Sequence, residues 1–183
     1  MANKIKYGIK NAYYAKKTAN GTYDTPVRLP GAVSLSLDPQ GDISVFHADN
    51  IQYFKSATNN GYEGDLELAL IPETFYTDIL GDTQETGGVL LENADAISTE
   101  FAFGVQFEGD ARATRFWFYN CVATRPTVEG ETKESSIDPK TETLTISAAP
   151  GEDGIVRART TSETTDAVYN AWFSAVYAPS AGE

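Results

Sequence analysis

The sequence contains one histidine, His47, and one cysteine, Cys121, which limits the chemistry open to it. Asp42 and Asp49 lie near His47 along the chain, but one histidine without a second histidine or a cysteine makes a poor transition-metal site. Neighbouring residues of a strand also face opposite ways, which separates these side chains. We therefore interpret His47 as an ordinary loop histidine and predict no catalytic, cofactor-binding or metal-binding residue.

Nucleophilic and phosphate-binding motifs do not occur in the sequence. There is no G-x-S-x-G elbow, no P-loop and no G-x-G-x-x-G sequence. Neither Cys121 nor any serine has an evident activating base. Residues 38–42 and 93–95 carry oxygen ligands of the kind that Ca²⁺ prefers, but neither has the spacing of a calcium loop, and turn chemistry accounts for both.

Carboxylates on or beside predicted strands could supply the paired acids of a glycosidase. They are Glu63, Asp65, Glu67, Glu100, Glu108 and Asp110. Such an enzyme needs two carboxyl groups that converge across a cleft at roughly 5 to 10 Å, which the sequence does not specify. Trp117 and Tyr119 could stack on sugars, although core packing is the commoner role. A solvated acidic face is the simpler interpretation, and we predict that the protein is not an enzyme.

The composition is that of a folded, acidic protein. A chain of 183 residues with 41% hydrophobic residues can bury a core of its own, and we expect one domain over residues 1–183. Lys and Arg number 14 and Asp and Glu 26, so the formal net charge is −12. A surface this acidic repels phosphate, which argues against sequence-specific binding of nucleic acid but permits nucleic acid to pass without adhering.

No segment of the chain predicts export or membrane insertion. The first residues lack an apolar core of the signal-peptide kind, and no run approaches the ~18 apolar residues of a membrane span. The lone cysteine cannot form an internal disulfide, in keeping with a reducing compartment. We expect a protein that remains in the cytoplasm, or in a particle assembled there.

Alternation of apolar and polar residues predicts a mainly β protein, built as two packed antiparallel sheets with one or two short helices. The clearest pattern covers residues 101–124, where two β-favouring runs flank a turn at Gly109-Asp110. The second run carries bulky groups on both faces and places Asn120 and Val122 on the face of its phenylalanines. Such a strand is expected inside a sandwich or at a protein contact.

Other strands are predicted where alternation recurs. They cover residues 5–15, 33–37, 65–70, 89–91, 143–148 and 155–160. The 33–37 strand is expected to stop at Asp38-Pro39, and the proline-flanked stretch 25–31 to be a connector.

Two helices and one long loop complete the expected elements. A short helix begins after Pro72 and ends before Gly81, which suits the C′ position. A C-terminal helix is predicted over residues 166–177. The polar stretch 126–140 has no periodicity and is expected to be a surface loop.

Residues 38–60 predict an arm or hairpin that projects from the core. Two short aromatic-bearing runs, 43–46 and 51–54, are mixed here with Asp, Asn and Gly. Apolar side chains exposed on such an arm are a liability unless a neighbouring molecule covers them. The candidate subunit-interface residues are Phe46, Asn50, Ile51, Tyr53 and Phe54.

Several sequence motifs, taken in order, resemble those of the major tail proteins of long-tailed, non-contractile bacteriophages and prophages of Gram-positive bacteria. The motifs are GAVSLSLDPQGD (31–42), ADN (48–50), NNGYEGDLELALIPETF (59–75), ATRFWFYNCVATRPTVEGETKESSIDPKTETLTISAAP (113–150) and AVYNAWFSAVY (167–177). The likeness covers nearly the whole chain in collinear order, and none of the motifs is a catalytic signature.

The resemblance implies a tail-tube fold whose copies form six-membered rings that stack into a hollow tube for phage DNA. It implies that strands of adjacent subunits join around the lumen and that the 38–60 arm reaches a neighbouring subunit or ring. The implied partners are further copies of the chain, the tape measure, tail terminator and distal tail proteins, and DNA in transit without specific binding, with no membrane and no cofactor. The implied location is the virion tail tube, assembled in the host cytoplasm.

A lumen lined by carboxylates and hydroxyls would let DNA slide because it repels phosphate. The candidate lumen residues are Asp65, Glu67, Thr143 and Thr145, the polar alternates of strands whose other face is aliphatic. Two alternatives stay open: a tube protein of the type VI secretion kind, and a carbohydrate-binding or carbohydrate-active β-sandwich.

Overall fold

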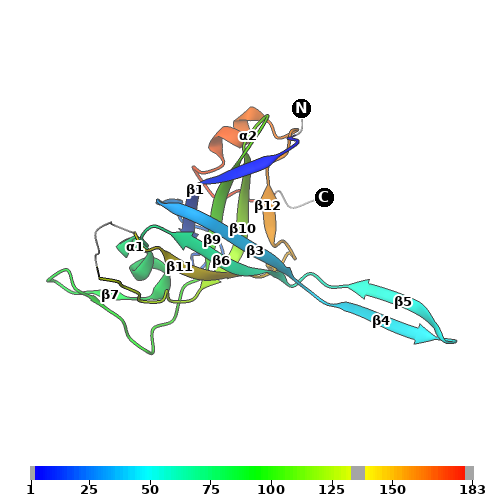
Figure 1. Ribbon diagram of the computed structural model, residues 1–183, viewed down its shortest axis with the longest axis horizontal. Helices are drawn as coiled ribbons and strands as arrows, with labels where there is room; N and C mark the ends of the chain where they lie inside the picture. The colour runs from blue at the N-terminus through cyan, green and yellow to red at the C-terminus, as the bar shows by residue number, and fades with distance from the viewer. Residues whose placement is uncertain (1–2, 133–138, 180–183) are drawn as a thin grey trace.

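The computed structural model describes residues 3–132 and 139–179 and shows a mainly β protein with short helices and a long projecting hairpin (Figure 1). Most strands form one antiparallel sheet in the order β2-β1-β9-β10-β11-β6-β3, with β12 also paired to β10. The fold class predicted from the sequence, with its projecting hairpin, is confirmed. The strands of this sheet are β1 (Lys6–Lys16), β2 (Val27–Leu29), β3 (Ala32–Gln40), β6 (Gly61–Leu68), β9 (Phe101–Gly109), β10 (Thr114–Ala123), β11 (Glu142–Ala148) and β12 (Arg157–Arg159).

The remaining elements lie outside this sheet. The strands are the hairpin β4 (Ile43–Ala48) and β5 (Ile51–Ala57) and the small ribbon β7 (Thr83–Gln84) and β8 (Leu90–Leu91). The helices are α1 (Glu73–Phe75), which continues into the π-helical turn η1 (Tyr76–Leu80), and α2 (Asp166–Ala171).

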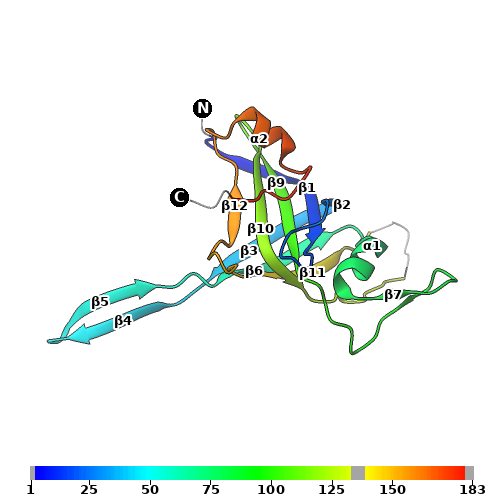
Figure 2. The same cartoon turned by 180° about the vertical axis from the view of Figure 1, so that it is seen from behind.

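The sheet folds into two packed layers because β10 changes partner along its length. Its residues 116–118 pair with β12, whereas its residues 121–123 pair with β11. Strands β11, β6 and β3 then turn across β1, β9 and β10 (Figures 1 and 2). Apolar side chains of both layers meet in the main core, which includes Tyr14, Leu66, Leu68, Phe75, Phe101, Phe103, Phe118, Leu144 and Ile146.

The opposite face of β9 and β10 is also buried, under the C-terminal part of the chain. Ala102, Trp117 and Trp172 belong to this second core. The rings of Tyr13 and Phe173 stack 4.5 Å apart, and the Trp117 indole Nε1 donates to the carbonyl of Trp172 at 2.9 Å. The central hairpin is therefore packed on both faces, as its bulky side chains predicted.

Asn120 interrupts the alternation of β10. The prediction that Asn120 and Val122 share the face of the phenylalanines was therefore wrong. Its φ of 47° is left-handed, and the pairing of β10 with β9 shifts between Phe118 and Cys121. A bulge of this kind moves the residues that follow it to the other faces. Cys121 consequently packs in the main core, where burial raises the pKa of its thiol, and Val122 is 42% exposed.

Two predictions at the ends of the sheet were also wrong. The stretch 25–31, expected to be a connector, contains β2, which pairs with β1. Strand β3 continues through Asp38 and Pro39 to Gln40 instead of stopping there. Both strands are the outermost of the sheet, and an edge strand tolerates proline because its outer N–H groups have no ladder partner to lose.

The helices agree with the sequence in position but not always in length. The first one begins after Pro72 and ends at Gly81, which is left-handed with a φ of 80°, as predicted for a C′ residue. The helix predicted over 166–177 ends at Ala171. Beyond it, the carbonyls of Trp172 and Tyr177 accept hydrogen bonds from β10 side chains, which holds the chain against the second core.

The loop predicted over 126–140 falls partly outside the described residues, which omit 133–138. Residues 126–132, 139 and 140 belong to no helix or strand.

Packing on both faces of the central hairpin depends on a glycine. A Cβ added to Gly104 would lie 2.7 Å from two ring atoms of Trp117. We expect Gly104→Ala to lower the free energy of unfolding by about 1 to 3 kcal/mol, the usual cost of overpacking, as measured by urea denaturation. Gly130→Ala is the matched control, because a Cβ there meets nothing within 4 Å. Equal stability of both variants would contradict this packing.

Candidate functional site

Three adjacent strands, β3, β6 and β11, present a face made only of acids and hydroxyls. Their register places Glu67 between Ser34 and Thr143, and Asp65 between Ser36 and Thr145. In a third row, Glu63 lies between Asp38 and Ser147. We call this surface the polar sheet face; its nine residues are Ser34, Ser36, Asp38, Glu63, Asp65, Glu67, Thr143, Thr145 and Ser147.

The polar sheet face exists because its strands bury their alternate residues. Leu35, Leu66 and Leu144 are neighbours across the same three strands, and the last two are fully buried in the main core. Since successive side chains of a strand point to opposite faces, the polar residues between them must face solvent. The surface therefore follows from the register of the core.

Hydroxyl groups hold the carboxylates of this face in place. The Ser34 hydroxyl donates to Glu67 Oε2 at 2.7 Å, and the Thr141 hydroxyl donates to Glu67 Oε1 at 2.6 Å. Thr145 donates in the same way to Asp65 at 2.8 Å. Hydrogen bonds from Thr141 and Ser34 stabilise the ionised form and lower the pKa of Glu67. The face is consequently anionic at neutral pH and contains no basic residue.

The arm, residues 43–57, is the second candidate site. Its strands β4 and β5 pair only with each other and leave the body along the longest axis of the molecule (Figure 1). The two-residue loop at its tip places Asp49 and Asn50 at φ of 51° and 59°, the left-handed values that a type I′ turn requires. Asparagine at position 50 is therefore explained by the left-handed backbone of the turn.

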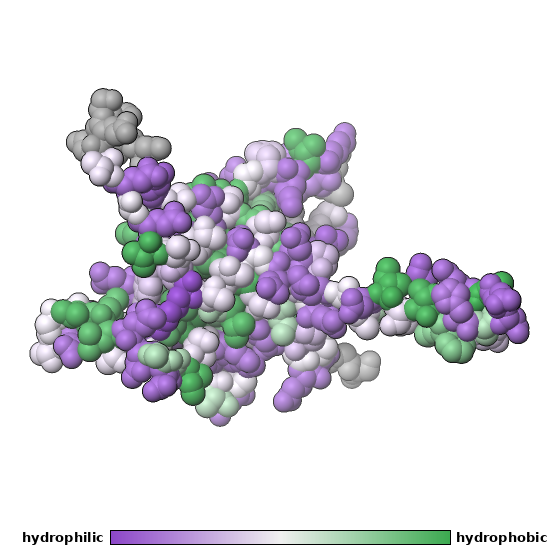
Figure 3. All heavy atoms as spheres, turned by 60° about the horizontal axis from the view of Figure 1, so that its bottom comes forward, coloured by the Kyte–Doolittle hydropathy of each residue, from purple (hydrophilic) through white to green (hydrophobic). Residues whose placement is uncertain are grey.

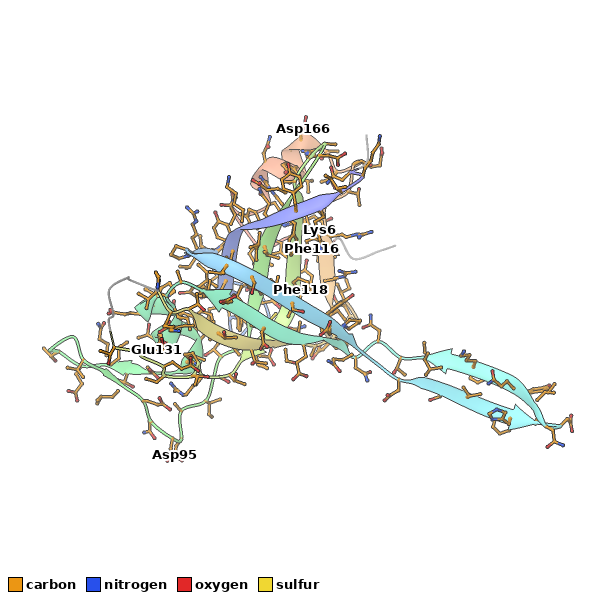
Figure 4. All side chains as sticks on the ribbon, in the orientation of Figure 1. Lys6, Asp95, Phe116, Phe118, Glu131 and Asp166 are labelled. Carbon is orange, nitrogen blue, oxygen red and sulfur yellow. The ribbon has the colours of Figure 1, made fainter. Side chains whose placement is uncertain are left out.

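Apolar side chains on the arm are uncovered in the single protein chain. Phe46, Ile51, Tyr53 and Phe54 are 60 to 70% exposed. The register pairs Phe46 with Phe54 and then shifts, so that Tyr53 is an extra residue beside them. Figure 4 shows the arm's side chains directed into open space, with no part of the body beside them. A two-stranded hairpin alone is marginally stable in water, so burial of these apolar side chains would stabilise the arm.

An open cavity of about 820 Å³ offers a small ligand a place to bind, which bears on the carbohydrate alternative. It is lined by Lys17, Tyr23, Tyr119 and Asn120, among others. Tyr119 donates its hydroxyl to the Tyr177 carbonyl at 2.7 Å, and burial raises its pKa. Tyr23 and Lys17 both hydrogen bond Asn120 Oδ1. Tyr23 and Lys17 are therefore occupied in holding the bulge of β10, and Tyr119 in holding the C-terminal segment.

The carboxylates of the polar sheet face lie on an open sheet surface and not across a cleft. Glu63, Asp65 and Glu67 alternate along one strand, about 7 Å apart on an open sheet surface. None of the three lines the 820 Å³ cavity, whose acidic lining residues are Glu152 and Asp153.

The part of the chain that the structure describes contains no group of three or more His, Cys, Asp or Glu side chains placed to hold a metal ion. Within the same residues, no helix is long and apolar enough to cross a membrane.

Sequence analysis found part of each candidate site. The four candidate lumen residues, Asp65, Glu67, Thr143 and Thr145, share one face and are paired in two rows. Sequence analysis predicted a strand over residues 33–37 but did not place its serines on that face. The signal was present, since serines alternate with leucines in β3, but only the register shows that they flank Asp65 and Glu67.

No model of a known protein family matches the chain, and no curated protein matches it significantly.

The lowered pKa of Glu67 can be tested directly by carboxyl NMR titration. Removing both donors with Ser34→Ala and Thr141→Val should raise this pKa toward the ordinary 4.5. In the parent protein, the stability contributed by these bonds is present above the ordinary pKa and is lost as pH falls through the lowered value. Ser36→Ala, one row away, is the control and should leave Glu67 unchanged. An unaltered pKa in the double variant would show that the hydroxyls do not hold Glu67.

Proposed function

We propose that this protein is a structural subunit that polymerises into a hollow tube, the tail tube of a long-tailed bacteriophage, through which the viral genome passes. The observation that carries the proposal is the uncovered apolar arm on an otherwise strongly acidic protein. The order of sequence motifs described above supports the same class.

The charge of the arm favours self-association. Residues 43–57 contain one acid, Asp49, and one base, Lys55, whereas the whole chain has a formal net charge of −12. Copies of a strongly acidic protein repel each other, and a neutral, aromatic segment is where that repulsion is least. Burying it against another copy removes apolar area from water, worth about 25 cal/mol per Å².

The polar sheet face suits the lining of a DNA conduit. Each subunit would contribute four carboxylates and five hydroxyls without a single Lys or Arg. Phosphates near such a surface are repelled, so duplex DNA gains no binding energy from it. The wall would let DNA move because it offers nothing that holds it.

The open edge of β3 supports assembly around a lumen. Strand β3 is the last strand of the sheet order and carries Ser34, Ser36 and Asp38 of the polar sheet face. A neighbouring strand paired to this edge would satisfy its free backbone groups and continue the polar surface into the next subunit. Closure of such a sheet into a barrel removes the edge altogether.

A tube subunit of the type VI secretion kind would use the arm and the polar sheet face in the same way. Binding of an outer sheath protein would distinguish it from the tail tube proposed here.

Removing the arm tests its role in assembly. Replacement of residues 43–57 by Asn-Gly joins Asp42 to Thr58, which already hydrogen bond at 2.9 Å. We expect a folded monomer whose free energy of unfolding stays within about 1 kcal/mol of the parent, because among the described residues the strands of the arm pair only with each other. Sedimentation velocity should show no polymer.

The control for the arm experiment is Val128→Ser, at a side chain that is 98% exposed outside the arm. This variant should polymerise like the parent. Polymers of normal size from the armless protein would contradict the role of the arm.

Charge reversal on the polar sheet face tests the conduit. Assemblies of Glu63→Lys/Asp65→Lys should retain duplex DNA at about 50 mM salt and release it near 200 mM, as phosphate contacts do. Assemblies of the parent should retain none, as measured by co-sedimentation. Glu129→Lys/Glu163→Lys, which makes the same change in net charge elsewhere, is the control. Equal retention by both double variants would show that the face does not meet the DNA.

A further inference from the structure

The molecule has a second projection, opposite the arm. Residues 82–98, here named the opposite loop, contain the ribbon β7–β8 and extend from the far end of the longest axis (Figures 1 and 4, where Asp95 is labelled). We propose that the opposite loop of one copy receives the arm of the next. This inference rests on the proposed function, because it identifies the surface through which the polymer grows.

Exposed apolar side chains make the opposite loop a match for the arm. Val89 is 55% exposed, Leu91 46% and Ile97 88%. Figure 3 shows hydrophobic residues gathered at both ends of the long axis. Contact between the two ends would cover both sets at once, whereas contact of the arm with the polar sheet face would bury carboxylates without partners.

The opposite loop is held in shape by its own chain, so it can receive a partner without first ordering. Arg125 bonds Asp82 at 2.8 Å, Glu92 at 3.1 Å and the carbonyl of Leu80 at 3.0 Å. Its return to the body is fixed by the Thr99 N–H, which donates to the Ile79 carbonyl at 2.8 Å. A preorganised surface loses little conformational entropy when it binds.

The charges at the two ends favour contact between the opposite loop and the arm. The opposite loop contains four acids and no base, and two of its acids, Glu85 and Asp95, form no ion pair among the described residues. On the arm, Lys55 likewise has no ion pair within that part of the chain. It shares a face with Val45, whose partner it is in the register, while Phe46 and Phe54 occupy the other face. The face of the arm that carries Val45 and Lys55 can therefore pack on the loop, with Lys55 beside the loop's acids.

Different surfaces on the two copies give the contact a direction. An arm that binds a loop leaves a free loop on its own copy and a free arm on the next, so the contact repeats instead of closing as a two-fold dimer. A repeating contact of this kind is what growth of a polymer needs.

Disulfide trapping tests the contact in the full chain, with Cys121→Ala as the background. Tyr53→Cys protein and Leu91→Cys protein, distinguishable by an isotope label, are mixed and oxidised. We expect mixed dimers to exceed either homodimer at least about fivefold, because the contact joins unlike surfaces. Tyr53→Cys mixed with Val128→Cys is the control and should give only the random yield. A random yield from the first mixture, or an excess of Tyr53→Cys homodimers, would overturn the inference.

A charge exchange provides the second, independent reading. Lys55→Glu should weaken polymerisation, and Glu85→Lys/Asp95→Lys in the same chain should restore it. Failure of that rescue counts against the contact. Electron micrographs separate the two proposals. Rings or tubes without the 53–91 crosslink reject the opposite loop as receptor and leave the tube function standing, whereas the crosslink without rings or tubes rejects the tube function alone. Loss of both rejects both.

Discussion

Burial of the hairpin β9–β10 on both of its faces is the constraint on which the structure depends. One face packs in the main core against β6 and β11, and the other packs against the chain that follows α2. Trp117 fills the second core only because Gly104 on the adjacent strand has no side chain. With this hairpin in the centre, the outer strands have one dry face each, and their other face is left to solvent.

The two candidate sites follow from that arrangement. The register that buries Leu66 and Leu144 also aligns acids and hydroxyls on the outer side of β3, β6 and β11. The chain between β3 and β6 has no place in the packed layers, and it leaves the body as a hairpin that pairs only with itself. The polar sheet face and the apolar arm therefore both follow from the strand pairing of one sheet.

Much of the fold could be predicted from alternation, because a strand with one buried face shows its period in the sequence. The hairpin at Gly109-Asp110, the arm and the short helix before Gly81 were all predictable in this way. Alternation failed where backbone geometry departs from regular strand, as at Asn120, whose bulge sends Cys121 inward. It also failed for the end of α2, which is set by hydrogen bonds from distant β10 side chains. Pairing between strands was not predictable, and for that reason the contribution of β3 to the polar sheet face was missed.

The central claim is that the protein's exposed apolar surface is covered by further copies of itself around an acidic lumen. Cryo-electron microscopy of the purified protein at high concentration tests this claim most directly. The account predicts rings or tubes in which residues 43–57 are buried in a neighbouring subunit and Asp65 and Glu67 face the central channel. A protein that stays monomeric at every concentration, or an assembly in which the arm lies in solvent and the channel is lined by another face, would contradict it.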